Sequence, residues 1–137
     1  RLVAGQRVLI HGAAGAVGVF AVQLAHWRGA RVIGTASANN VDFVRGLGAD
    51  EVIDYRAERF EDVVRDVDVV FDTVGGSVAE RSFAVLKPGG RAAFIASGPT
   101  APKPSRDDVR SLRPPVTGRD LVSYMDLNRS VGVDVRK

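Results

Sequence analysis

The sequence contains no cysteine, so disulfide bonds, thiolate–zinc sites and a cysteine nucleophile are excluded from its 137 residues. It has no apolar run long enough to cross a bilayer and no signal-peptide pattern, so we expect a cytoplasmic protein without a membrane partner. Neither sign of charge dominates: 19 basic and 16 acidic residues give a net charge of +3. Without a concentrated basic block, nucleic acid is not an expected partner.

Histidine is also scarce, because His11 and His26 are the only two in the chain. Neither has a partner at metal-ligand spacing, so we expect no metal site and assign both to structural roles. The beginning, RLVAGQRVLIHG, has no methionine and reads as an excerpt from a longer protein.

What the sequence does contain is a regular alternation of strand-like and helix-like segments, typical of a parallel sheet. We predict an α/β Rossmann fold, a doubly wound parallel sheet with helices on both faces. Five short strands rich in Val, Ile, Phe or Ala are predicted: Arg7–His11, Arg31–Thr35, Glu51–Ile53, Val67–Asp72 and Arg91–Ala96.

Four helices are predicted between these strands: Ala16–Arg28, Asn40–Leu47, Glu58–Arg65 and Ser77–Leu86. The first shows apolar residues at helical spacing, namely Val17, Phe20, Ala21, Leu24 and Trp27. Gly29 and Gly48 follow the first two helices, where a left-handed residue is expected, and Ser77 is predicted to cap the last.

The chain divides by composition into two parts. Residues 1–98 form the predicted core of the dinucleotide-binding Rossmann domain. Residues 99–137 are rich in Pro and Arg at first, which predicts a loop or an excursion at the sheet edge. Within Asp120–Lys137 we predict a helix to about Arg129 and a final strand, which complete or extend the same domain.

A glycine-rich loop stands between the first predicted strand and the first predicted helix. Residues 13–18 fit the pattern G-x-G-x-x-G with alanine first, and Gly12, Gly15 and Gly18 offer a second spacing. Glycine allows the backbone to approach a pyrophosphate closely, and a helix N-terminus supplies free amides and a positive dipole. The loop therefore predicts a dinucleotide site, with the Ala16 and Val17 amides as pyrophosphate donors.

The end of the second predicted strand favours NADP over NAD. An NAD site usually has Asp or Glu there to bind the ribose hydroxyls, whereas this strand ends in Thr35-Ala36-Ser37. A carboxylate would repel a 2′-phosphate, and small hydroxyl side chains leave room for it. The neutral donors available are Ser37, Asn39, Asn40 and Tyr55.

Four ordered motifs resemble the medium-chain dehydrogenase/reductase superfamily, in its zinc-independent quinone oxidoreductase and enoyl reductase branch. They are AGQRVLIHGAAGAVGVFAVQLAHWRGARVIGT, LGADEVIDYR, VDVVFDTVGG and LKPGGRAAFIASG. The resemblance implies NADP(H) as cofactor, held by Ala14, Gly15, Ala16, Val17 and Gly18 at the pyrophosphate. It further implies Ser37 and Tyr55 at the 2′-phosphate, Thr73, Val74 and Gly75 under the adenine ribose, and Ala96, Ser97 and Gly98 near the nicotinamide. Relatives commonly carry Lys or Arg in the stretch that matches Asn39 and Asn40, and this chain has neither.

The resemblance implies an enzyme that moves hydride from NADPH to a quinone or an α,β-unsaturated carbonyl or enoyl acceptor. Members of this branch have a β-rich domain before this segment and a return segment after it, which together build the substrate cleft. Catalytic residues are therefore expected outside this chain, and the isolated chain is expected to be inactive. The resemblance also implies a possible homodimer through the sheet edge near Arg110–Val116.

Three other functions fit some of the same residues. A non-catalytic nucleotide-binding module would bind cofactor and lack a substrate site. A short-chain dehydrogenase needs a Tyr-x-x-x-Lys pair, but Tyr55 is followed at that spacing by Arg59 and Tyr124 by Asn128. An S-adenosylmethionine-dependent methyltransferase is suggested by LKPGG at 86–90, but it needs an acidic residue after the second strand.

Overall fold

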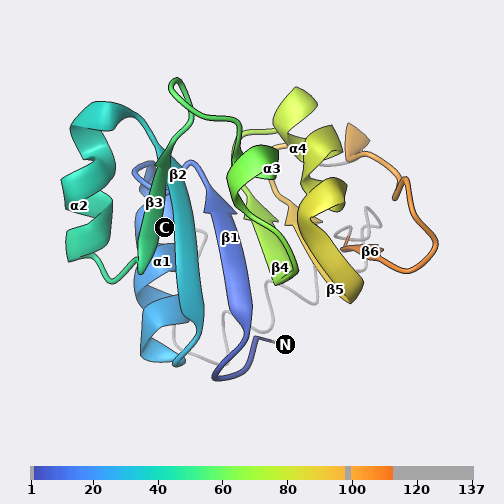
Figure 1. Ribbon diagram of the computed structural model, residues 1–137, viewed down its shortest axis with the longest axis horizontal. Helices are drawn as coiled ribbons and strands as arrows, with labels where there is room; N and C mark the ends of the chain where they lie inside the picture. Colours follow the sequence, from blue (N-terminus) through green and yellow to red (C-terminus); the bar gives the residue numbers. More distant parts are fainter. Residues whose placement is uncertain (1, 98–99, 113–137) are drawn as a thin grey trace, which may run out of the picture.

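A computed structural model describes residues 2–97 and 100–112 of the chain. Its centre is a six-stranded, wholly parallel sheet in the order β3-β2-β1-β4-β5-β6 (Figure 1). The strands are β1 (Arg7–His11), β2 (Arg31–Ala36), β3 (Glu51–Asp54), β4 (Val67–Asp72), β5 (Leu86–Phe94) and β6 (Arg110–Leu112). This is the Rossmann order, so the predicted fold class is confirmed, and β1 and β4 begin and end where the sequence predicts.

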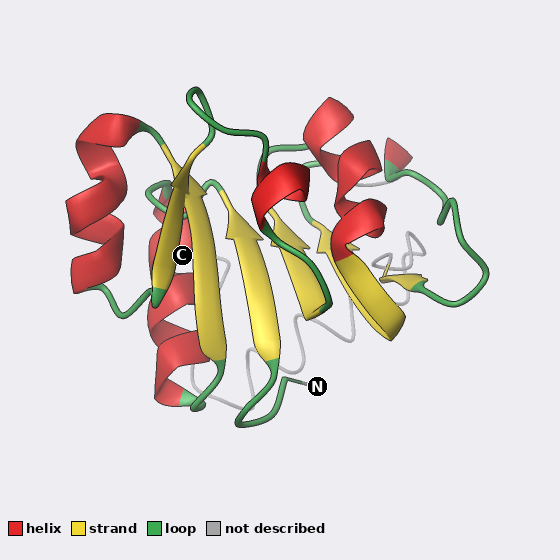
Figure 2. Ribbon diagram, viewed as in Figure 1, coloured by secondary structure: helices red, strands yellow, loops and turns green. Residues whose placement is uncertain are grey.

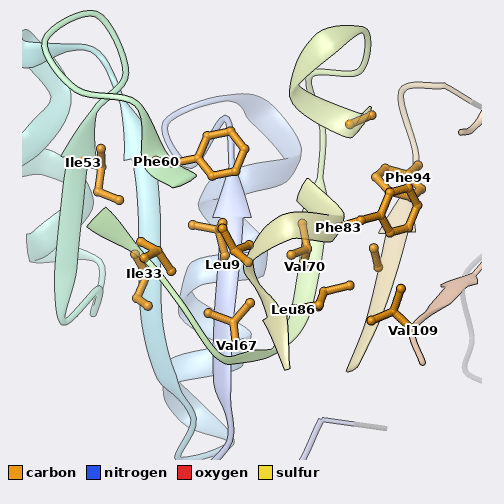
Figure 3. Close-up of a cluster of buried hydrophobic side chains, with 14 of the residues drawn as sticks. Leu9, Ile33, Ile53, Phe60, Val67, Val70, Phe83, Leu86, Phe94 and Val109 are labelled. Carbon is orange, nitrogen blue, oxygen red and sulfur yellow. The ribbon is translucent and has the colours of Figure 1, made fainter. Parts of the chain in front are cut away.

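Helices cover both faces of the sheet (Figure 2). They are α1 (Ala16–Trp27), α2 (Val41–Gly46), α3 (Phe60–Val63) and α4 (Ser77–Arg81), with short 3₁₀ turns η1 (Ala38–Asn40) and η2 (Ser82–Val85). One buried cluster includes Val22 of α1 and Val44 of α2. A second cluster includes Phe60 of α3 and Phe83 of η2, and Figure 3 shows it packed over the central strands. None of the described helices is long and apolar enough to cross a membrane.

Helix α1 is confirmed, but its apolar stripe does not face the core. Its buried residues are Gly18, Val22 and Ala25, whereas Phe20, Leu24 and Trp27 are exposed. The reason lies at Gly18, where a Cβ would collide with the carbonyl oxygen of Gly12. That close approach turns the Gly18 side of the helix toward the loop and the sheet, and helical periodicity then buries Val22 and Ala25.

Several element boundaries differ from the prediction. Strand β5 begins at Leu86 and not at the predicted Arg91, so residues 87–90 lie within it, with a register shift opposite Val67 to Val69. Gly89 has a positive φ of 81° there, and its amide donates to Asp108 O. Strand β6 was not predicted and pairs in parallel with β5. Gly76 is the N-cap of α4, and no side-chain cap bond forms, so the predicted capping role of Ser77 is wrong.

Two glycines adopt the predicted left-handed conformation after their helices. Gly29 has φ 79° and Gly48 has φ 118°. A Cβ on Gly48 would overlap the ring of His26, which lies in α1. The helix and strand predicted within Asp120–Lys137, and most of the predicted dimer stretch, lie outside the described residues.

Candidate functional site

The loop between β1 and α1 has a tightly determined backbone. Gly12 adopts φ 69°, a left-handed conformation in which a side chain would be strained. Its amide donates to Thr35 Oγ1 at 3.3 Å, and the next amide, of Ala13, donates to Thr35 O at 3.0 Å. A Cβ on Gly12 would also overlap Thr73 Oγ1, so the ends of β1, β2 and β4 leave no room for a side chain at this glycine.

The start of α1 presents unpaired backbone amides beside that loop. The first bond of the helix runs from the Val19 amide to Gly15 O at 3.0 Å, and the N-cap Gly15 supplies no side-chain bond. The first amides of an α-helix have no partner within the helix and carry the positive end of its dipole. The amides of Ala16, Val17 and Gly18 are therefore available to an anion.

A cavity of about 590 Å³ opens beside this loop. Its walls come from the carboxyl ends of β1, β2 and β3 and from residues of α3 and α4. This edge is where ligands bind in open parallel α/β sheets. The lining residues are His11, Gly12, Ala14, Gly15, Thr35, Ala36, Ser37, Asn40, Tyr55, Glu58, Arg59, Phe60, Val74, Val78 and Arg81.

His11 lies at the floor of the cavity in a directional chain of hydrogen bonds. Ser82 Oγ donates to Val78 O at 2.6 Å, so it accepts from His11 Nε2–H at 3.0 Å. His11 Nδ1 then accepts from the Thr35 hydroxyl at 3.3 Å. Burial, together with the nearby positive charge of Arg81, lowers the pKa of His11 from 6.5 to about 3. The ring is therefore neutral at pH 7, with its proton on Nε2, and it links the Gly12 loop to η2.

Asp72 organises the loop after β4. Its carboxylate accepts from the Val74 amide at 2.9 Å and from the Gly75 amide at 3.0 and 3.2 Å. Burial raises its pKa, although both amide bonds oppose the change. The side chain is fully buried, so this carboxylate shapes a loop. Gly75 has φ 81°, and a Cβ there would contact Ser97 Oγ at 3.3 Å.

Two arginines that line the cavity, Arg59 and Arg81, meet at Glu61. Arg81 Nη1 donates to both Glu61 carboxylate oxygens at 2.8 Å, and its guanidinium lies 4.9 Å from the centre of the Phe60 ring. Arg59 Nε and Nη2 donate to Glu61 Oε1 at 2.9 and 2.7 Å. Burial alone would raise the pKa of Glu61, but the bonds from Arg81 and Arg59 lower it to about 2.

The structure brings part of the predicted site together around this cavity. The predicted residues that line it are Ala14, Gly15, Ser37, Asn40, Tyr55 and Val74. Ala16, Val17 and Gly18 begin α1, Asn39 lies in η1, and Ala96 and Ser97 follow β5 beside Gly75. Thr73 Oγ1 donates to His11 O at 2.7 Å, so it closes the loop and does not line the cavity. Gly98 lies outside the described residues.

Sequence reasoning missed four charged or aromatic residues of the cavity: Glu58, Arg59, Phe60 and Arg81. They belong to α3, the turn before it and α4, elements that carry no nucleotide motif. For Glu58, Arg59 and Phe60 the one available signal was their closeness in sequence to Tyr55, which was predicted, and Arg81 had no such signal. Within residues 2–97 and 100–112, no group of three or more His, Asp and Glu side chains could hold a metal ion.

Comparisons with known proteins agree with this geometry. A sequence profile described as zinc-binding dehydrogenase matches residues 16–125. The spectinabilin polyketide synthase system protein NorB of Streptomyces orinoci is 45% identical over 102 residues, which cover 71% of this chain and 5% of that protein. The chloroplastic NADPH-dependent alkenal/one oxidoreductase of Arabidopsis thaliana is 41% identical over 101 residues, covering 72% and 26%.

Solved structures give the same match. Escherichia coli quinone oxidoreductase complexed with NADPH superposes with a TM-score of 0.73 at 26% identity, over 96% of this chain and 46% of that one. The chain thus spans less than half of this structure and about a quarter or less of the two curated relatives.

Proposed function

The chain belongs to the zinc-binding dehydrogenase family, in the quinone oxidoreductase and enoyl reductase branch of the medium-chain dehydrogenases/reductases, and on this premise we propose that it binds NADP(H). The whole protein would then be an oxidoreductase that transfers hydride from NADPH to a quinone or an α,β-unsaturated carbonyl or enoyl acceptor. Relatives named for such reactions support this proposal, as does the NADPH named with the bacterial quinone oxidoreductase.

One observation carries the proposal: the Gly12–Gly18 loop leaves free helix amides beside a cavity whose β2 edge lacks a carboxylate. Side chains at Gly12 or Gly18 would fill the space that the backbone needs. The cavity at the end of β2 is lined by Thr35, Ala36 and Ser37, which do not repel a phosphate. Both features fit a phosphorylated dinucleotide.

When bound, NADPH supplies the hydride itself, and the protein supplies position and field. We assign Ala14 to Gly18 to the pyrophosphate, with the amides of Ala16 and Val17 as donors. We assign the adenosine end to Ser37, Asn39, Asn40 and Tyr55, and its ribose to Thr73, Val74 and Gly75. Ala96, Ser97 and Gly98 are assigned to the nicotinamide end.

Binding of NADPH to the chain tests the assignment of the loop. Isothermal titration is expected to show NADPH binding to the wild-type chain and about tenfold or greater loss in Gly18→Ala, because the added Cβ displaces the Gly12 carbonyl. Gly46→Ala is the matched control, since a Cβ there meets no atom within 4 Å. Absence of NADPH binding in the wild-type chain, with unfolding curves that show it folded, would overturn the proposal.

Turnover separates an enzyme from a binding module. NADPH oxidation is measured with a series of quinones and enones, using the longest chain that contains these residues. Acceptor-dependent oxidation is expected. Tight NADPH binding without oxidation by any acceptor would favour the non-catalytic nucleotide-binding module.

A further inference from the structure

The turn after β2 provides no positive charge for a phosphate. Residues 37–40 read Ser-Ala-Asn-Asn, and the Asn40 side-chain amide donates to Ser37 Oγ at 3.2 Å. These two polar groups thus partly satisfy one another. A 2′-phosphate carries negative charge, and a charge-assisted bond from Arg or Lys is roughly twice as strong as a neutral one.

The following loop brings a cation to the same place. The Tyr55 amide donates to Ala36 O at 3.2 Å, so the chain leaves β3 beside the end of β2. The turn ends at Phe60, whose ring meets the His11 ring edge-on at a centroid distance of 4.5 Å, above the end of β1. Figure 3 shows Phe60 beyond the tip of β1. Between these two anchors lies Arg59, which lines the cavity together with Ser37 and Tyr55.

Arg59 is positioned by Glu61, yet its positive charge is not fully neutralised. Its Nε and Nη2 donate to Glu61, while Nη1 makes no bond recorded within the described part of the chain. Glu61 carries one negative charge against the two positive charges of Arg59 and Arg81, so the three side chains leave a net charge of +1. The Arg59 side chain is 68% exposed, whereas that of Glu61 is 13% exposed, so the arginine is the accessible member.

We propose that Arg59 is the residue that selects NADPH over NADH, by pairing with the adenosine 2′-phosphate at the cavity wall formed with Ser37 and Tyr55. This inference rests on the proposed function, because it assumes that the cavity holds the adenosine end of a dinucleotide. The guanidinium supplies the planar donor geometry that matches phosphate oxygens. Glu58 lines the same cavity and opposes phosphate, which limits the affinity that Arg59 provides.

The test compares two neighbouring arginines. Arg56 lies over the ring of Tyr55, with its guanidinium carbon 5.6 Å from the ring centre, and it does not line the cavity. In calorimetric titrations, Arg59→Gln is expected to weaken NADPH binding about tenfold and to leave NADH binding unchanged, whereas Arg56→Gln changes neither. The probes 2′,5′-ADP and 5′-AMP, which differ by the 2′-phosphate, are expected to divide in the same way.

Three further readouts depend on charge. Arg59→Lys is expected to recover part of the NADPH preference, and Glu58→Gln to strengthen binding of NADPH alone. The preference of the wild-type chain for NADPH is expected to shrink as salt is raised, since the arginine is exposed to solvent.

The possible outcomes distinguish a failure of the Arg59 assignment from a failure of the proposed function. If the wild-type chain prefers NADPH and Arg59→Gln keeps that preference, the assignment of Arg59 is wrong and the proposed function stands. If the folded wild-type chain binds neither dinucleotide, both are wrong. Equal weakening of NADPH and NADH in Arg59→Gln also contradicts a role at the 2′-phosphate.

Discussion

The buried His11 makes the stability of this domain depend on pH between about 3 and 6.5. The pKa of His11 falls from 6.5 in the unfolded chain to about 3 in the folded one, because burial and the positive charge of Arg81 disfavour the imidazolium. Between these values the unfolded chain binds the extra proton and the folded chain does not. The free energy of unfolding therefore rises with pH in this window. The contribution of the neutral His11 ring is fully present above pH 6.5 and is lost as the pH falls toward 3.

The size of the effect follows from the unfolded-state pKa. At pH 5 a group of pKa 6.5 that stays neutral when folded reduces the free energy of unfolding by about 2 kcal/mol relative to pH 7.5. Glu61 contributes little between pH 5 and 7.5, because its pKa falls from 4.5 to about 2 and its own window lies below that range. Asp72 lies opposite His11 in the register of β1 and β4, and its raised pKa makes the free energy of unfolding change with pH in the opposite direction. Asp72 is retained when His11 is substituted, so a comparison of wild type with a His11 variant isolates the histidine.

Urea unfolding at pH 7.5, 6.5, 5.5 and 5.0 (about the window set by the two pKa values) measures the effect. His11→Gln is expected to lose the pH-dependent part, while His26→Gln, which alters an exposed histidine of α1, keeps it. Nitrogen NMR of the wild-type chain is expected to show a neutral Nε2–H ring at pH 5. Identical pH slopes in wild type and His11→Gln, or an imidazolium signal at pH 5, would show that His11 is not the buried neutral group that sets this pH dependence.

Three further changes probe the fold, each by urea unfolding. Val22→Ala should lower the free energy of unfolding by about 2 kcal/mol and Leu24→Ala by less than about 0.5 kcal/mol, because only Val22 is buried; equal losses would contradict the observed face of α1. Asp72→Ala should lower it by about 1–3 kcal/mol by leaving two loop amides unpaired, with Asp72→Asn milder, and the reverse order would argue against capping. For Glu61, stability present above pH 4.5 should fall as pH drops toward 2, and Glu61→Gln should remove that fall; an unchanged acid limb would show that the ion pairs contribute nothing.

The strands were predictable because each is a short apolar run that a glycine or a polar turn interrupts. In β1 and β4 most residues of the apolar run are buried, and the bounds of both strands agree with the prediction. Strand β6 escaped prediction because it has three residues with no buried side chain. Its identity as a strand comes from pairing with β5, which is a tertiary property.

Helix α1 shows why apolar periodicity located the helix without orienting it. Its exposed residues Phe20, Leu24 and Trp27 recur at helical spacing as regularly as the buried ones. The orientation is decided by volume, since only a residue without a Cβ fits against the Gly12 carbonyl. A glycine in a phosphate-loop pattern therefore carries two kinds of information, access to a ligand and the choice of helix face, and the second outweighs hydrophobicity here.

The proposed cofactor preference illustrates the same difference between local and tertiary information. The turn Ser37–Asn40 is all that a local pattern offers at the end of β2, and it contains neutral donors only. The loop after β3 then crosses to β1 because Phe60 packs against His11, and this path carries Arg59 into the cavity. No spacing rule links Arg59 to Ser37, since their closeness depends on the path of a loop between strands. If Arg59 pairs with the 2′-phosphate as proposed, the charge that recognises the phosphate comes from an element that follows the motif, and the β2 turn alone does not reveal it.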